Sequence, residues 1–128
     1  MKIYRVYRYL DGSVAATVER DPSGLIRSVV THIPIHSPDG FEFGYGGSGP
    51  ADLALAILAD FLGASTDPNT YKGFAVDLKG PARTAWRHHQ AFKRDFVAPA
   101  EEVGFSVTSD EIEEWLYNAI KEDQRRNT

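Results

Sequence analysis

The 128-residue sequence contains no cysteine. Disulfides, a thiolate nucleophile and cysteine-held metal clusters are therefore excluded. No apolar run approaches the roughly 18 residues that a membrane-spanning helix requires. The first residues, MKIYR, also lack the apolar stretch of a secretory signal. We therefore expect neither a membrane span nor secretion through such a signal.

An excess of basic charge is also missing. The formal net charge is −4 at pH 7, from 14 Lys and Arg residues against 18 Asp and Glu residues. Proteins that bind nucleic acid irrespective of its sequence usually carry a basic surplus, so the charge argues against nucleic acid as a partner. The remaining composition, with 42% hydrophobic and 25% charged residues, is typical of a globular chain. The length predicts a single α+β domain over residues 1–128.

The N-terminal third predicts antiparallel strands. Residues 2–9 are rich in Tyr, Ile and Val, and Asp11-Gly12 is a hairpin signal because glycine accepts positive φ. An alternating segment starts at Val14, and residues 25–33 are β-branched and apolar. We expect these three segments to form a meander. Short strands are also candidates at 41–43, 74–78 and 105–107, and we predict a sheet of three to five strands.

Three helices are expected to pack mainly on one face of this sheet, which makes the fold class α+β. The first runs from about Pro50 to Leu62 and stops at Gly63. It is apolar almost all round, so we predict a central, buried helix. The second covers residues 81–97, and the third follows a capping box formed by Thr108 and Glu111.

A glycine-rich loop precedes the first helix. Gly44, Gly46 and Gly49 match the pattern G-x-G-x-x-G, but the rest of the chain does not provide the βαβ unit of a dinucleotide-binding fold. Pro50 and Ala51 stand where a phosphate-binding P-loop needs Lys and Ser or Thr. A nucleophile elbow fails as well, because Pro50 replaces its second glycine.

Two interpretations of this loop remain open. In the first, the glycines turn the chain sharply into a buried helix that Ser48 caps. In the second, the loop binds a ligand, because free N–H groups at a helix N-terminus attract anions and Tyr45 can stack on a bound group. The candidate ligand-binding residues are Tyr45, Gly46, Gly47, Ser48 and Gly49.

A basic stretch from Lys79 to Arg94 is the second candidate surface. It contains Arg83, Arg87, Lys93 and Arg94 and has no acidic residue. This pattern predicts either a solvated helix face or an anion-binding patch that takes a phosphate or an acidic protein surface. The second interpretation gains weight if the helix lies beside the glycine-rich loop.

The histidines do not indicate a metal site. His88 and His89 are adjacent and diverge on a helix, and Pro34 prevents a helix between His32 and His36. His89 falls on the apolar stripe of its helix, which predicts a hydrogen-bonded core histidine. We expect no metal and no cofactor.

Two segments carry a resemblance to a known family. Residues 41–58, FEFGYGGSGPADLALAIL, and residues 90–97, QAFKRDFV, resemble a family of small domains of unknown function found in bacterial and phage genomes. The resemblance covers residues 40–98 well and the N-terminal sheet loosely. It implies a cytoplasmic protein carried by mobile elements and brings no catalytic residue. It also suggests that the loop and the segment around Lys93 and Arg94 act together, with one of these cations pairing with Asp52 or meeting an anion.

These observations favour a non-enzymatic binding module. Its partner would be a protein or a phosphate-bearing small ligand, as in an inhibitor of a host system or a sponge for a signalling nucleotide. The alternatives are an enzyme acting on a nucleotide or phosphorylated substrate, with His88 or Asp77 as acid or base, and a structural, oligomer-forming domain.

Overall fold

Alternating residues of the N-terminal strands define the core face of an antiparallel sheet. The computed structural model describes residues 1–20, 23, 26–72 and 78–126. The sheet has four strands in the order β3-β2-β1-β4, namely β1 (Ile3–Arg8), β2 (Val14–Glu19), β3 (Arg27–Val29) and β4 (Gly104–Thr108). Tyr4 is paired with Val18 on one side and Val107 on the other, and all three are at most 1% exposed. The predicted meander β1–β2–β3 is confirmed.

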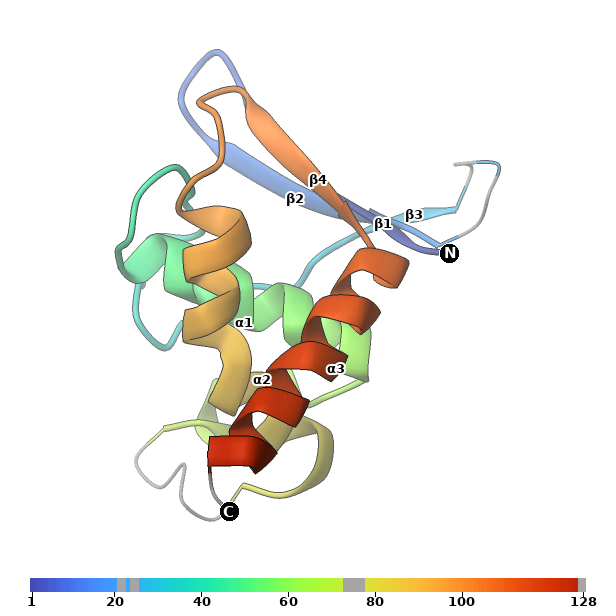
Figure 1. Ribbon diagram of the computed structural model, residues 1–128. Coiled ribbons are helices and arrows are strands. Elements are labelled where there is room, and N and C mark those ends of the chain that lie inside the picture. Colours follow the sequence, from blue (N-terminus) through green and yellow to red (C-terminus); the bar gives the residue numbers. More distant parts are fainter. Residues whose placement is uncertain (21–22, 24–25, 73–77, 127–128) are drawn as a thin grey trace.

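The helices lie on one side of this sheet, as expected (Figure 1). They are α1 (Ser48–Leu62), α2 (Gly80–Phe92) and α3 (Ser109–Arg126). A short 3-10 turn, η1 (Pro68–Thr70), follows α1, and a π-helical segment, η3 (Lys93–Val97), continues α2. The fold is therefore α+β. None of the helices in the described ranges is long and apolar enough to cross a membrane.

Helix α1 is the central helix that its composition predicts. Every residue from Gly49 to Ala59 is buried, and Gly63 ends the helix in the left-handed conformation at φ 68°. Its start differs from the expectation that Ser48 caps it. The N-cap residue is Gly47, which has no side-chain cap, and Ser48 is already the first helical residue. The chain therefore enters the helix two residues before Pro50.

Helix α3 begins as its capping box predicts. The Glu111 N–H donates to Thr108 Oγ1 at 3.1 Å, and the Thr108 N–H donates to the Glu111 carboxylate at 3.1 Å. Ile112 and Leu116 are buried in its first turns. The helix is thereby fixed directly to the end of β4.

Three predicted strands differ from the structure or lie outside the residues that it describes. Residues 41–43 are not a strand, because they pair with none of the four strands of the sheet; the Phe43 ring packs against Phe105. The third strand is shorter than the predicted 25–33 and covers only Arg27–Val29. The expected strand at 74–78 lies outside the described residues, apart from Leu78, which is buried. The strand expected at 105–107 is confirmed as β4, at the edge of the sheet next to β1.

Candidate functional site

The glycine-rich loop lies against the end of η3. Gly44 adopts a φ of 87°, which favours glycine, and its N–H donates to the Val97 carbonyl at 3.0 Å. A Cβ at Gly47 would lie 2.5 Å from Cε2 of the Tyr45 ring, and one at Gly49 would lie 2.7 Å from Cβ of Glu42. The positive φ thus favours glycine at position 44, and close packing favours glycine at positions 47 and 49. Only at Gly46 does the loop leave open space.

The loop presents few groups to a ligand. Tyr45 is 53% exposed, and Ser48 is exposed while Gly49 is buried. Pro50 has no N–H, and the Ala51 N–H already donates to the Gly47 carbonyl at 3.0 Å. A ligand at this end of α1 is therefore restricted to the N–H groups of Ser48 and Gly49 and to the Tyr45 ring.

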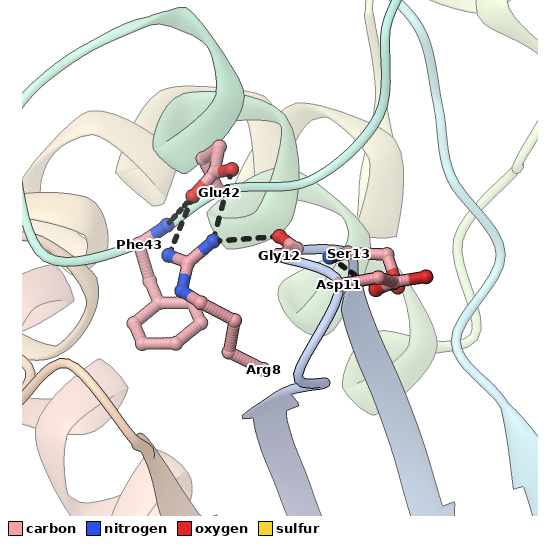
Figure 2. Close-up of polar contacts among 6 residues, drawn as sticks. All are labelled: Arg8, Asp11, Gly12, Ser13, Glu42 and Phe43. Carbon is pink, nitrogen blue, oxygen red and sulfur yellow. Dashed lines mark hydrogen bonds and ion pairs between the residues drawn. The ribbon is translucent and has the colours of Figure 1, made fainter.

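An arginine at the end of β1 holds the segment that leads into the loop (Figure 2). The Arg8 guanidinium donates to both carboxylate oxygens of Glu42, at 2.7 and 3.2 Å, and to the Gly12 carbonyl at 3.0 Å. It also lies 4.6 Å from the centroid of the Phe43 ring. Hydrogen bonding to Arg8 lowers the pKa of Glu42. Glu42 thus remains ionised and tied to the sheet, directly above Gly49.

A buried carboxylate organises the loop between β3 and α1. Asp52 of α1 is 0% exposed and accepts hydrogen bonds from the N–H groups of His36 and Ser37, at 2.8 and 3.0 Å. Its third contact is with Nε2 of His32, at 2.9 Å. The pairing of Asp52 with Lys93 or Arg94, which the resemblance suggested, is absent among the described residues. Loop 32–37 occupies this carboxylate instead.

A ring stack joins that loop to α2. His36 Nε2 lies 3.1 Å from His89 Nε2, and His36 stacks on Trp86 at 5.8 Å between ring centroids. His89 is 2% exposed, and its Nδ1 lies 2.5 Å from the Trp86 carbonyl. Burial lowers the pKa of His89 to about 4. The predicted core histidine is confirmed. No group of three or more potential metal ligands occurs in the described ranges.

The basic residues divide between two faces of α2. Arg83, Arg87 and Arg94 are exposed and follow the helical repeat along one face. Arg87 Nε donates to Asp123 of α3 at 2.7 Å, and Arg94 Nε donates to Asp95 at 2.9 Å. Arg83 has no ion pair among the described residues. By the same repeat, Lys93 falls on the face of Trp86 and His89, and its charge contributes to the lowered pKa of His89.

The arginines border a groove between α2 and α3. One hollow in it is lined by residues of both helices, among them Arg83, Arg87, His88, Ile120 and Asp123. A second hollow continues past His88 and Asp123 to Arg94 and Trp115. His88 is 6% exposed, with Nε2 3.5 Å from Asp123 Oδ2, and burial lowers its pKa. The groove therefore has the neutral His88 on its floor, and its edges carry arginines of which most are paired with carboxylates.

The two candidate surfaces lie at different places along the second helical segment. The loop contacts Val97 at its C-terminal end. Arg87 precedes Val97 by ten residues, which corresponds to about 15 Å along a helix, and Arg83 lies a further turn away. Lys93 and Arg94 are nearer the loop, within about one turn of Val97. Arg83 and Arg87 therefore lie in the α2–α3 groove away from the loop, whereas Arg94 lines the groove at the end nearer the loop.

Comparison with known proteins supplies the family. A model of the family of unknown function DUF6166 matches residues 4–78, which is more than half of the chain. The chain belongs to this family. The DUF6166 match includes the glycine-rich loop and Asp52 and ends before α2. No curated protein and no solved structure matches the chain.

Sequence reasoning missed two of the clusters described above. Asp52 and His36 are 16 positions apart, and His36 and His89 are 53 apart, so no local spacing reveals their contacts. Arg8 and Glu42 are likewise 34 positions apart. One sequence feature could have indicated the first cluster: Asp52 is a charged residue on a helix that is otherwise apolar, and a buried charge requires partners.

Proposed function

We propose that this DUF6166 protein is a cytoplasmic, non-enzymatic binding module that recognises an anionic group of its partner through the arginine face of α2. The observation that supports this best is the placement of Arg83, Arg87 and Arg94 along one groove. Arg83 has no carboxylate partner in the described part of the chain. Arg87 uses only Nε toward Asp123, so its two terminal nitrogens remain available.

Arginine suits such recognition because its planar guanidinium binds a carboxylate or a phosphate through two parallel hydrogen bonds. The partner is therefore an acidic protein surface or a phosphate-bearing small ligand. Two binding modules of this kind are an inhibitor of a host system and a protein that sequesters a signalling nucleotide (a nucleotide sponge). The proposal includes that the gene is carried by phage or other mobile elements.

Thermal unfolding with added anions tests this function. The probes are inorganic phosphate, tripolyphosphate, common nucleotides and cyclic dinucleotides. A ligand that binds only the folded chain at a hundredfold excess over its Kd adds about 2.7 kcal/mol of stability. Arg83→Gln should weaken the binding of an active anion about tenfold, since one charge-assisted hydrogen bond is lost.

The matched control is Lys121→Gln, which removes the same charge from an exposed position of α3 outside both hollows. It should leave the Kd unchanged. An anion that stabilises wild type and Arg83→Gln equally contradicts the arginine face as the site. The absence of any shift, together with no binding of an acidic peptide, contradicts the function itself.

Recovery of the ligand distinguishes binding from catalysis. A module releases each nucleotide intact, whereas the enzyme alternative converts it, with His88 as acid or base. Asp77, the other candidate for that role, lies outside the described residues. Conversion that His88→Asn abolishes would establish the enzyme in place of the module.

Tyr45 carries a second candidate, in which the glycine-rich loop itself binds the ligand. The ring is half exposed and lies against Gly47. If the loop is the site, Tyr45→Ala and Gly47→Val lower the affinity for a stabilising anion and Arg83→Gln does not. The opposite pattern assigns the anion to the α2–α3 groove.

A further inference from the structure

We propose that the groove between α2 and α3 seats an acidic amphipathic helix of a partner protein. The inference rests on the proposed function and specifies its partner. It follows from the shape of the groove, from the exposure of its charges and from the length over which its arginines extend.

Two contacts hold the antiparallel helices together and leave a gap between them. Trp115 of α3 packs edge-on against Phe92 and Phe96, with ring centroids 5.3 and 5.9 Å apart, and its Nε1–H donates to Asp95 at 2.9 Å. The second contact is the ion pair between Arg87 and Asp123. These contacts are eight positions apart on each helix, from Arg87 to Asp95 and from Trp115 to Asp123.

Small side chains occupy the space between the two contacts. Ala91 of α2 and Ala119 of α3 both line the second hollow. Ile120 continues the apolar surface into the first hollow, beside Arg83. The floor of the groove thus contains a narrow apolar strip, which is open to solvent and lies beside the polar side chains of His88 and Asn118.

The edges of the groove present positive charge outward. The side chains of Arg94 and Arg126 are 72% and 74% exposed, whereas their partners Asp95 and Glu122 are 37% and 42% exposed. Asp123, which Arg87 binds, is 30% exposed. Asp95 is already bound by Arg94 and Trp115, and Asp123 by Arg87. A partner that lies over the groove therefore meets guanidinium groups that are more exposed than the carboxylates they bind.

The length of this cationic edge favours a helix over a single small anion. Arg83 and Arg94 are eleven positions apart, which corresponds to about 16 Å along α2. One phosphate reaches only one or two of these side chains. A helix with acidic residues at helical spacing reaches all of them, and its apolar face covers the strip over Ala91 and Ala119.

The test uses the full chain and three probes. The first is a designed 18-residue peptide with leucines on one helical face, flanked by glutamates. The second has lysine in place of every glutamate, and the third is an oligothymidylate. The acidic peptide should bind at one site and at least about tenfold more tightly than the lysine peptide. Its binding should shift the NMR resonances of Ala91 and Ala119.

Variants locate the binding site. Ala119→Phe fills the hollow, and Arg83→Glu reverses a charge at its edge without touching the packed core. Each should weaken the acidic peptide about tenfold. Lys121→Glu, the same charge reversal on an exposed part of α3, should change the affinity less than about twofold. Arg83→Glu should keep the NMR spectrum of the folded chain, so it still tests the proposal if Ala119→Phe unfolds the chain.

Results that contradict the helix-docking proposal can be distinguished from results that contradict the proposed function. Equal affinity for the acidic and lysine peptides, or unchanged affinity in Arg83→Glu, overturns the helix-docking proposal. Tighter binding of the oligothymidylate in the same groove also overturns it, in favour of nucleic acid. If tripolyphosphate binds through Arg83 while the acidic peptide fails, the proposed function stands and this inference does not. If neither tripolyphosphate nor the acidic peptide binds, both the proposed function and this inference are wrong.

Discussion

The Nε2 atoms of His36 and His89 lie 3.1 Å apart, within hydrogen-bond distance. The Trp86 carbonyl only accepts hydrogen bonds, so His89 Nδ1 carries a proton and donates to it. A neutral His89 then has an unprotonated Nε2, and His36 must be the donor. The contact joins loop 32–37 to α2.

The stability of the fold should therefore fall between about pH 6.5 and pH 4. Burial lowers the pKa of His89 to about 4, so in this interval the unfolded chain binds a proton that the folded chain does not. The depression corresponds to roughly 3 kcal/mol, fully present above pH 6.5 and lost as the pH falls toward 4. Urea unfolding measured at half-unit steps of pH checks this.

The matched variant for that measurement is His89→Gln, which cannot titrate. Its unfolding free energy should depend less steeply on pH over the same interval, although the protein is less stable throughout. Burial also lowers the pKa of His88, and this contributes a smaller slope of the same sign. A variant with the full wild-type slope would assign the pH dependence to other groups.

Loss of the Asp52 carboxylate should loosen the loop between β3 and α1. Asp52→Ala leaves the N–H groups of His36 and Ser37 without their acceptor and should cost about 2–4 kcal/mol. Asp39→Ala, which alters an exposed aspartate of the same connection, should stay within about 0.5 kcal/mol of wild type. Equal unfolding free energies for the two variants would refute the anchoring role of Asp52.

Two glycines of the same loop should respond oppositely to alanine. Gly49→Ala places a Cβ 2.7 Å from Cβ of Glu42 and should destabilise the chain by about 1–3 kcal/mol. At Gly46 the new Cβ meets open space, and the smaller freedom of the unfolded chain should add roughly 0.4–1 kcal/mol. Thermal unfolding of the pair measures the difference, and similar midpoints would contradict the close packing at Gly49.

The stability that the Arg8–Glu42 ion pair contributes should depend on charge and not on side-chain size. Glu42→Gln keeps the shape but weakens both hydrogen bonds from the guanidinium, so the melting temperature should fall. High salt should narrow the gap between variant and wild type, because both side chains are partly exposed. A gap that salt leaves unchanged would indicate that packing, not the ion pair, holds the loop.

Local patterns in the sequence sufficed for most of the secondary structure. The alternation around Val14, the apolar surface of α1 and the capping box at Thr108 depend on neighbours along the chain, and each prediction was confirmed. The strand expected at 41–43 was wrong because this segment has no pairing partner in the sheet, and a local pattern does not reveal pairing partners.

The candidate site was less accessible from sequence for the same reason. The spacing of Arg83 and Arg87 places them on one helix face, but only the structure shows that this face borders α3. The partners of Asp52 and His89 come from segments far apart in the chain. Whether the glycine-rich loop or the arginine face binds a ligand stays a prediction for the experiments above.

The pairing of β1 with β4 has a consequence for synthesis. Ile3 pairs with Thr108, so about 100 residues must be made before β1 acquires its second neighbour. At roughly 5–20 residues per second, the nascent chain exposes that strand edge for about 5–20 seconds. The segment that matches the family ends at residue 78. A nascent chain of that length contains neither β4 nor Val97, whose carbonyl accepts the hydrogen bond from the Gly44 N–H. A ribosome that stalls there would leave a sheet with an open edge, ready to pair with another chain.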